Sequence, residues 1–159
     1  MTVRFGIGVD VHPLAVGRKL VLGGVNLAHP HGLAGHSDSD VLTHSIIDAL
    51  LGAAGMGDIG THFPPGDEKY QGIDSTFLLS RTVEIIAEDN WRVQYVDAKI
   101  LAERPTLRPH ISEIRATLAR SLQVPDSLVS VKATTTDGLG FTGRGEGIAS
   151  LAVATLDDS

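Results

Sequence analysis

Residues 3–12 alternate between apolar side chains and glycine or polar residues, and this period of two constrains the fold more than any other feature of the sequence. Such alternation predicts a β-strand with two chemically different faces. The apolar face carries Phe5, Ile7, Val9 and Val11. On the other face Asp10 and His12 lie roughly 6 to 7 Å apart, because residues two apart in a strand point the same way. We expect the apolar face to be buried and the other to carry out chemistry.

The composition limits the kind of protein that this chain can be. Its 159 residues have the length of one domain, and such a chain can bury about 70% of its unfolded surface. Asp and Glu outnumber Lys and Arg by 19 to 13, which argues against a general nucleic-acid-binding protein. Without cysteine, any metal must bind to His and carboxylates. No signal-peptide or membrane-spanning pattern occurs, so we expect a cytoplasmic protein with no membrane partner.

The hydrophobic patterns predict a strand first, then a short hairpin, two helices, a strand, a helix and two final strands. The expected strands cover residues 3–12, 20–22, 25–27, 91–101, 128–134 and 147–156, and the helices begin near Val41, Ser75 and Pro109. This order predicts an α+β domain over residues 1–159, a two-layer sandwich in which helices cover one face of a mixed sheet, with a ferredoxin-like relation. The last strand has apolar residues on both faces, which either a partner subunit or helices of the same chain could cover.

His44 lies in the first predicted helix and can join Asp10 and His12 around one divalent metal ion. Two imidazoles and one carboxylate leave a coordination position open, as catalytic zinc sites do, and manganese or iron tolerates the same ligands. Asp40 and Asp48 lie four residues before and after His44, so either could accept the second imidazole N–H and orient the ring. Alternatively, the Asp-x-His pair is hydrogen-bonded for structure alone.

Three further segments suit a phosphate or a small ligand. His36 and Ser37 stand just before a helix N-terminus, where free N–H groups favour phosphate, although ordinary capping explains them too. Residues 58–64 form a loop after that helix, or simply a turn with a buried Phe. Residues 134–137 end a strand beside a glycine-rich run that lacks the spacing of a Walker phosphate loop; a tight connection with an ion pair is the alternative.

Together, motifs spread over nearly the whole chain resemble those of 2-C-methyl-D-erythritol 2,4-cyclodiphosphate synthases. They are Asp10-Val-His12, His36-Ser-Asp-x-Asp40, His44, Asp48–Ala54, Gly57-Asp-Ile-Gly60, Phe63-Pro64, Ala102-Glu-Arg-Pro105 and Lys132–Gly147. The resemblance implies a lyase of the non-mevalonate isoprenoid pathway. Such an enzyme converts 4-diphosphocytidyl-2-C-methyl-D-erythritol 2-phosphate to the cyclodiphosphate and releases CMP. The 2-phosphate of the substrate attacks its own β-phosphate, so no protein nucleophile is required.

The resemblance also implies a homotrimer with active sites between subunits, each with one Zn²⁺ and one Mg²⁺ or Mn²⁺. Asp10, His12 and His44 match the zinc ligands, and His36 and Thr135 match residues that stabilise the transition state. Asp137 matches the ligand of the second metal, but many members have Glu there. The positions that match substrate-binding residues are Asp10, His12, His36, Ser37, Asp58, Ile59, Gly60, Phe63, Asp67, Ala102, Pro105, Thr106, Leu107, Thr134, Thr135, Thr136, Asp137, Phe141 and Arg144.

Within this set the resemblance assigns different parts of the substrate to different segments. Asp58, Gly60 and Phe63 match the methylerythritol pocket, and residues 102–107 match the segment that cradles cytosine through its backbone. Thr106 replaces a common Lys, and Pro65 replaces a common acidic residue, whose sugar contact Asp67 could take over. Phe141 and Arg144 match residues that line an axial trimer cavity, where family members can hold an isoprenoid diphosphate.

Two other functions fit the same residues. A metal-dependent phosphoesterase would use the same metal site but attack the phosphate with water rather than with a group of the substrate. A non-catalytic trimeric binding module would hold a small ligand between subunits and use the metal only for structure. The products and the effect of removing His44 distinguish these functions.

Overall fold

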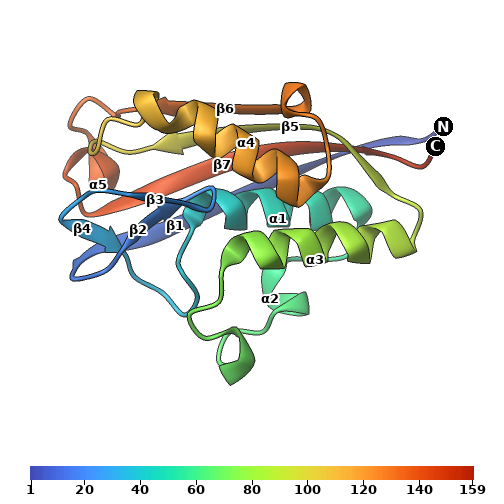
Figure 1. The fold of residues 1–159 in the computed structure, drawn as a ribbon, viewed down its shortest axis with the longest axis horizontal. Coiled ribbons are helices and arrows are strands. Elements are labelled where there is room, and N and C mark those ends of the chain that lie inside the picture. Colours follow the sequence, from blue (N-terminus) through green and yellow to red (C-terminus); the bar gives the residue numbers. More distant parts are fainter.

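A five-stranded sheet in the order β4-β1-β7-β5-β6 forms one layer of the structure, and the three long helices pack on one of its faces (Figure 1). This computed structural model describes residues 1–159. The strands of the sheet are β1 (Val3–Val16), β4 (His31–Leu33), β5 (Arg92–Leu101), β6 (Val129–Thr134) and β7 (Gly147–Asp157). Only β5 and β6 pair in parallel, so the sheet is mixed. The expected α+β fold, with helices on one face, is confirmed.

The helical layer consists of α1 (Val41–Ala54), α3 (Ser75–Glu88) and α4 (Ile111–Leu122). A small hairpin of β2 (Leu20–Leu22) and β3 (Val25–Leu27) accompanies it. The core lies between the layers and includes Leu42, Ile46 and Leu50 of α1, Leu79 and Ile86 of α3, Ile114 and Leu118 of α4, and Ile148 and Leu156 of β7. Burial of these side chains on one stripe of each helix is what holds the two layers together.

Helix α1 lies directly on strand β1, and two glycines of the strand make this possible. A Cβ atom on Gly6 would lie 1.9 Å from the carbonyl oxygen of Ala49. Twelve of the 14 residues of α1 are buried. The helix starts after the N-cap Asp40 and ends at Gly55, which has a left-handed conformation. The polar face of β1 is therefore the one that packs against the helix.

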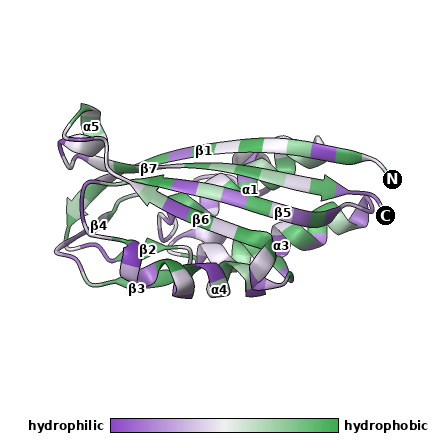
Figure 2. Ribbon diagram, turned by 90° about the horizontal axis from the view of Figure 1, so that it is seen from above, coloured by the Kyte–Doolittle hydropathy of each residue, from purple (hydrophilic) through white to green (hydrophobic).

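The apolar face of β1 is exposed, so the expectation that it is buried within this chain was wrong. Phe5 is 71% exposed, Ile7 66%, Val9 58% and Val11 47%. Green segments alternate with paler ones along β1 in Figure 2, as this pattern requires. The reason is that α1 packs on the side of the glycines, and the other long helices, α3 and α4, lie on that side of the sheet too (Figure 1).

Strand β7 continues this exposed surface. Leu151 and Val153 are each 41% exposed, whereas Ile148 and Leu156 on the alternate face are fully buried. Tyr95 of β5 adds a partly exposed ring. Of the two covers considered for the last strand, helices of the same chain therefore provide one face only. We call the exposed set, Val3, Phe5, Ile7, Val9, Val11, Tyr95, Leu151 and Val153, the open sheet face.

The predicted elements are present with boundaries that differ by a few residues, β1 being the longest extension. The sequence did not predict the shortest elements, because they contain too few residues for a periodic pattern. These are β4, the single-turn helices α2 (Ile59–His62) and α5 (Gly140–Gly143), and three short 3₁₀ turns. Phe77 of α3 is 59% exposed and does not belong to the core, although it is a large apolar residue. None of the helices has both the length and the apolar character needed to span a membrane.

Candidate active site

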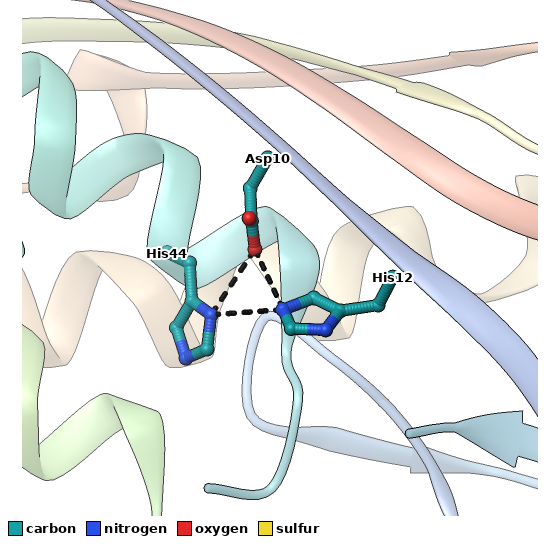
Figure 3. A group of neighbouring side chains, drawn as sticks. All are labelled: Asp10, His12 and His44. Atoms are coloured by element: carbon teal, nitrogen blue, oxygen red, sulfur yellow. Dashed lines mark hydrogen bonds and ion pairs between the residues drawn. The ribbon is translucent and has the colours of Figure 1, made fainter. Parts of the chain in front are cut away.

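Three side chains from β1 and α1 converge on one point (Figure 3). The Oδ2 atom of Asp10 lies 2.9 Å from Nε2 of His12 and 3.1 Å from Nδ1 of His44. The two imidazole nitrogens are 3.3 Å apart. The predicted grouping of Asp10, His12 and His44 is thus present, and it forms the one cluster of potential metal ligands in the chain.

Hydrogen bonds on the outer side of each ring orient the imidazoles toward this centre. The Nδ1 atom of His12 lies 3.0 Å from the carbonyl oxygen of Ala34, which can only accept, so His12 carries a proton there. The Nε2 atom of His44 lies 2.9 Å from Ser75 Oγ and 3.1 Å from Ser37 Oγ. Each ring therefore turns its other nitrogen toward the carboxylate of Asp10.

The close approach of these side chains shifts the pKa values of Asp10 and His12 in opposite directions. Burial alone would raise the pKa of Asp10, but hydrogen bonds and charge from His12 and His44 lower it to about 2. Burial alone would lower the pKa of His12, but its hydrogen bond to Asp10 and the negative charge there raise it above the usual value. The centre holds an ionised carboxylate and attracts positive charge, which a proton or a metal cation can supply.

These residues fit a divalent metal ion. One ligand atom from each of Asp10, His12 and His44 lies within 4.8 Å of the others, and two nitrogens with one oxygen is a donor set that zinc commonly takes. Because the three protein ligands approach from one side, the opposite side of the centre remains available to a further ligand. Asp10 and His12 are partly accessible from that side.

A cleft of about 290 Å³ opens beside this centre. Its lining contains Asp10, His12, His36, Ser37, His44, Ile59, Gly60, Phe63, Pro65, Tyr70 and Leu78. The predicted phosphate residues His36 and Ser37 are therefore brought together here with Ile59, Gly60 and Phe63, whereas Asp58 and Asp67 do not line the cleft. We call this space the metal cleft.

Within the metal cleft region the predicted polar residues have defined local partners. Ser37 is buried and His36 is exposed, with His36 Nε2 lying 3.2 Å from the carbonyl oxygen of Asp67. Asp58 caps α2, and hydrogen bonds from Thr61 lower the pKa of its exposed carboxyl. Asp67 caps a short 3₁₀ turn and forms an ion pair with Lys69 at 3.2 Å. Both carboxylates thus stabilise the loops that border the cleft.

A second cleft, of about 430 Å³, lies at the ends of β5 and β6. Its lining contains Ala102, Glu103, Pro105, Thr106, Leu107, Arg108, Ile111, Lys132, Ala133, Thr134 and Thr135. The predicted cytosine segment and the first two threonines of the 134–137 run therefore share one site. We call this space the nucleotide cleft.

No residue lines both clefts, so the chain does not join its predicted site residues into a single pocket. Thr136 and Asp137 come directly after Thr135 in the chain but do not line the nucleotide cleft. Asp137 has an exposed carboxylate and a left-handed backbone (φ 54°). Its Oδ1 accepts a hydrogen bond from Thr135 Oγ1 at 3.4 Å. Phe141 and Arg144 border neither cleft; Arg144 pairs with Glu146 at 2.9 Å.

The structure corrects the expected partners of His44. Asp40 is fully buried and accepts hydrogen bonds from the backbone N–H groups of Gly23, Gly24 and Thr43, so it holds the hairpin against the start of α1. Asp48 accepts from the N–H of Ile59. Neither carboxylate bonds to His44, because the outer nitrogen of that ring faces the start of α3 instead of its own helix.

Sequence reasoning missed two residues that complete the surroundings of His44. The sequence indicated Ser75 only as the start of a helix and Asp38 only as part of the motif at residues 36–40, yet Ser75 Oγ contacts His44 Nε2 and donates a hydrogen bond to Asp38 Oδ1. His44 and Ser75 are 31 residues apart in the chain and lie on different helices. No local spacing could have revealed the contact; only the packing of α3 against α1 brings it about.

Comparison with known proteins decides the family. A family model described as the YgbB family matches residues 3–157. The chain belongs to the YgbB family. A curated member, the 2-C-methyl-D-erythritol 2,4-cyclodiphosphate synthase of Salinibacter ruber, is 53% identical over 157 residues, which is 99% of this chain and all of that protein.

Solved structures of similar proteins have the same fold. The bifunctional IspDF from Campylobacter jejuni aligns with a TM-score of 0.94 and 39% identity, over 98% of this chain and 42% of that one. A 2C-methyl-D-erythritol-2,4-cyclodiphosphate synthase in its CDP-bound form aligns with a TM-score of 0.89 and 32% identity, over 97% of this chain and 100% of that one. The arrangement of strands and helices described above is thus that of the family.

Proposed function

We infer that this chain converts 4-diphosphocytidyl-2-C-methyl-D-erythritol 2-phosphate to 2-C-methyl-D-erythritol 2,4-cyclodiphosphate and releases CMP, as a lyase of isoprenoid precursor biosynthesis. The observation that carries this function is full-length membership of the YgbB family, with about half of the residues identical to a named synthase. The convergent Asp10, His12 and His44 side chains supply a site with the chemistry that the reaction needs.

The reaction needs positioning and charge stabilisation more than it needs a protein nucleophile. We propose that Asp10, His12 and His44 hold Zn²⁺, which when bound polarises the attacked phosphate group. Ser37 lies in the same cleft and can donate its hydroxyl proton to a phosphate oxygen. Ile59, Gly60 and the buried ring of Phe63 wall the cleft, which suits the small methylerythritol part, with Asp58 and Asp67 bracing the surrounding loops.

We propose that the nucleotide cleft takes the cytidine part of the substrate. Ala102 and Leu107 are buried, and the N–H of Ala102 donates to the carbonyl oxygen of Thr134, which ties the two sides of the cleft together. Pro105 and Thr106 complete the loop. The CDP found in a related solved structure supports a nucleoside diphosphate as ligand of this fold.

We further propose that the active enzyme is a homotrimer and that each complete site forms between two subunits. The metal cleft and the nucleotide cleft hold the two halves of the predicted site but share no residue within one chain. The open sheet face presents apolar side chains of β1, β7 and β5 side by side, which a second copy of the chain can bury. Thr135 and His36, the proposed transition-state residues, would then meet across the interface.

Two further ligands belong to this proposal. Asp137 has an exposed carboxylate next to Thr135 and would bind Mg²⁺ or Mn²⁺ at the diphosphate, with Thr136 beside it. Phe141 and Arg144, which lie outside both clefts, would line a cavity on the trimer axis and hold an isoprenoid diphosphate through the Arg144 guanidinium. A single domain over residues 1–159, a ferredoxin-like relation and a cytoplasmic location stay predictions.

Product analysis tests the function directly. Incubation with the diphosphocytidyl substrate, followed by phosphorus NMR, should show the cyclic diphosphate and CMP. Linear phosphate products with oxygen-18 from labelled water would instead indicate hydrolysis by a phosphoesterase and overturn the proposal. The same assay on a heat-denatured sample provides the background.

Replacement of a metal ligand tests whether the centre serves chemistry. His44→Ala should abolish turnover and zinc binding while circular dichroism shows a folded protein. The matched control is His31→Ala, which removes an exposed histidine of β4 that lies outside both clefts. A non-catalytic binding module with a structural metal would unfold in the His44 variant, and a folded, metal-free variant with full activity would refute the zinc assignment.

A further inference from the structure

The outer nitrogen of His44 is bonded to a buried hydroxyl at the start of a different helix. Its Nε2 atom lies 2.9 Å from Oγ of Ser75, the first residue of α3, which is fully buried. The inner nitrogen, Nδ1, faces Asp10 and His12 across the metal centre. Ser75 thus contacts a proposed metal ligand from the side away from the metal.

The direction of the hydrogen bond at Ser75 follows from its second partner. The hydroxyl of Ser75 lies at hydrogen-bond distance from Oδ1 of Asp38, and the backbone N–H of Ser75 donates to Oδ2 of the same carboxylate at 2.9 Å. An ionised carboxylate only accepts, so the single hydroxyl proton of Ser75 goes to Asp38. The oxygen of Ser75 can therefore only accept from His44, which places the imidazole proton on Nε2.

We propose that Ser75 and Asp38 are positioning residues, which fix the ring of His44 in the tautomer and orientation that present Nδ1 to the metal. This inference rests on the proposed metal site. A neutral imidazole carries one proton, so an acceptor held at Nε2 leaves the lone pair of Nδ1 free for coordination. Asp10 competes for that proton from the other side of the ring, which is why a firmly held acceptor at Nε2 matters.

Asp38 is itself held by the backbone around it. Its Oδ1 accepts from the N–H of Asp40 at 3.1 Å, and its own N–H donates to the carbonyl oxygen of Ile73 at 3.2 Å. The N–H of Gly72 donates to the carbonyl oxygen of His36 at 2.9 Å. The loop before α1 and the start of α3 are thereby joined as one unit, so the carboxylate cannot turn away without breaking several bonds.

The same arrangement gives Ser37 a defined role. Ser37 Oγ accepts from the N–H of Ser39 at 3.2 Å and lies 3.1 Å from Nε2 of His44. Because that nitrogen carries a proton, the hydroxyl proton of Ser37 has no acceptor within the chain. Ser37 lines the metal cleft, so its proton is available to a phosphate oxygen of the ligand.

Zinc affinity measured by competition with a chromophoric chelator tests the inference. Ser75→Ala removes the nearer acceptor and leaves only Ser37 Oγ, at 3.1 Å, and Asp38→Asn leaves a carboxamide that cannot accept from both the hydroxyl and the N–H of Ser75. Both variants should bind zinc about 10- to 100-fold more weakly, the usual effect of losing an outer partner of a metal-bound His. Ser80→Ala, which removes another hydroxyl of α3 with partners remote from the metal, should bind zinc like the parent chain.

Nitrogen-15 NMR of the zinc-loaded protein gives a second readout. The parent chain should show an Nε2-bound proton of His44 that is shifted downfield and protected from solvent exchange, and Asp38→Asn should weaken both properties even if Ser75→Ala fails to fold. Unchanged zinc affinity and an unchanged Nε2–H signal in the folded variants would overturn the inference. Absence of zinc binding in the parent chain would instead overturn the proposed metal site.

Discussion

A Cβ atom on Gly8 would lie 1.8 Å from the carbonyl oxygen of Ser45, so β1 and α1 are in direct backbone contact at this point. Ser45 follows His44, and Gly8 lies on the same face of β1 as Asp10. The contact therefore sets the separation of the two elements that carry the metal centre. Ser45 Oγ also bonds to Ser150 Oγ at 2.8 Å, which ties α1 to β7 beside it.

We expect Gly8→Ala to damage both stability and the metal centre. The added methyl group must push α1 away from β1, and overpacking of this kind costs roughly 1 to 3 kcal/mol or more. Chemical denaturation and zinc titration measure the two effects. The matched control is Gly52→Ala on α1: a Cβ there would have only one neighbour, at 3.9 Å, and Ala suits a helix better by roughly 1 kcal/mol. Equal stability of the two variants would contradict the close contact.

The sequence predicted the fold well where one element repeats a pattern over many residues. The period of two in β1 and the helical stripe of α1 were enough to place Asp10, His12 and His44 on facing elements. The same pattern predicted the wrong buried face for β1, because hydrophobicity does not show on which face a helix packs. Helix α1 packs on the face of Gly6 and Gly8, since only residues without a side chain admit its backbone there, and the apolar face remains exposed.

The partners of His44 show a second limit of local patterns. Asp40 and Asp48 share a helical stripe with His44, which made them candidates, but a ring on a buried helix can point toward a neighbouring helix. Ser75 lies 31 residues away, and its contact depends on how α3 packs on α1. Spacing within one element can predict a cluster only when the members lie on that element.

We expect Asp40→Ala to destabilise the protein by roughly 2 to 4 kcal/mol, through loss of the helix cap and through buried N–H groups of Gly23 and Gly24 left without a partner. Thermal unfolding of the metal-free protein measures this loss. Asp74→Ala at the cap of α3, where the carboxylate is exposed, should cost about 1 kcal/mol. Similar losses for the two would mean that Asp40 does not anchor the hairpin.

We expect zinc binding to weaken as the pH falls. The pKa of His12 is raised in the metal-free protein, so below that pKa zinc must displace a proton from the ring. Asp10, with a pKa of about 2, stays ionised over the same range and does not add to the effect. Calorimetric titration from about pH 8 to about pH 5 in buffers of different ionisation enthalpy counts the released protons. Zinc affinity that is constant over this range would rule out His12 as a ligand.

We expect Ile7→Glu to prevent assembly of the proposed trimer, because the change places a charge in the middle of the open sheet face. Ile7 is 66% exposed in the single chain, so the monomer should remain folded. Phe77→Glu is the matched control, since Phe77 is 59% exposed but lies on α3, away from that face. Light scattering and analytical ultracentrifugation measure the mass. A trimer that survives in the Ile7 variant would place the interface elsewhere.

We expect Asp137→Ala to weaken the dependence of turnover on Mg²⁺ or Mn²⁺ without changing zinc affinity. The Asp137 carboxylate lies at the turn after Thr135 and lines neither cleft of the single chain, so we expect it to reach the diphosphate of a ligand that extends beyond the nucleotide cleft. Asp137→Glu, which restores the longer carboxylate common in the family, should keep the metal dependence.

Asp126→Ala is the control for loss of charge, because it removes another exposed carboxylate in a short turn. An unchanged Mg²⁺ titration in Asp137→Ala would remove this residue from the metal site, whereas a change in zinc affinity would show that the two metal sites are not independent.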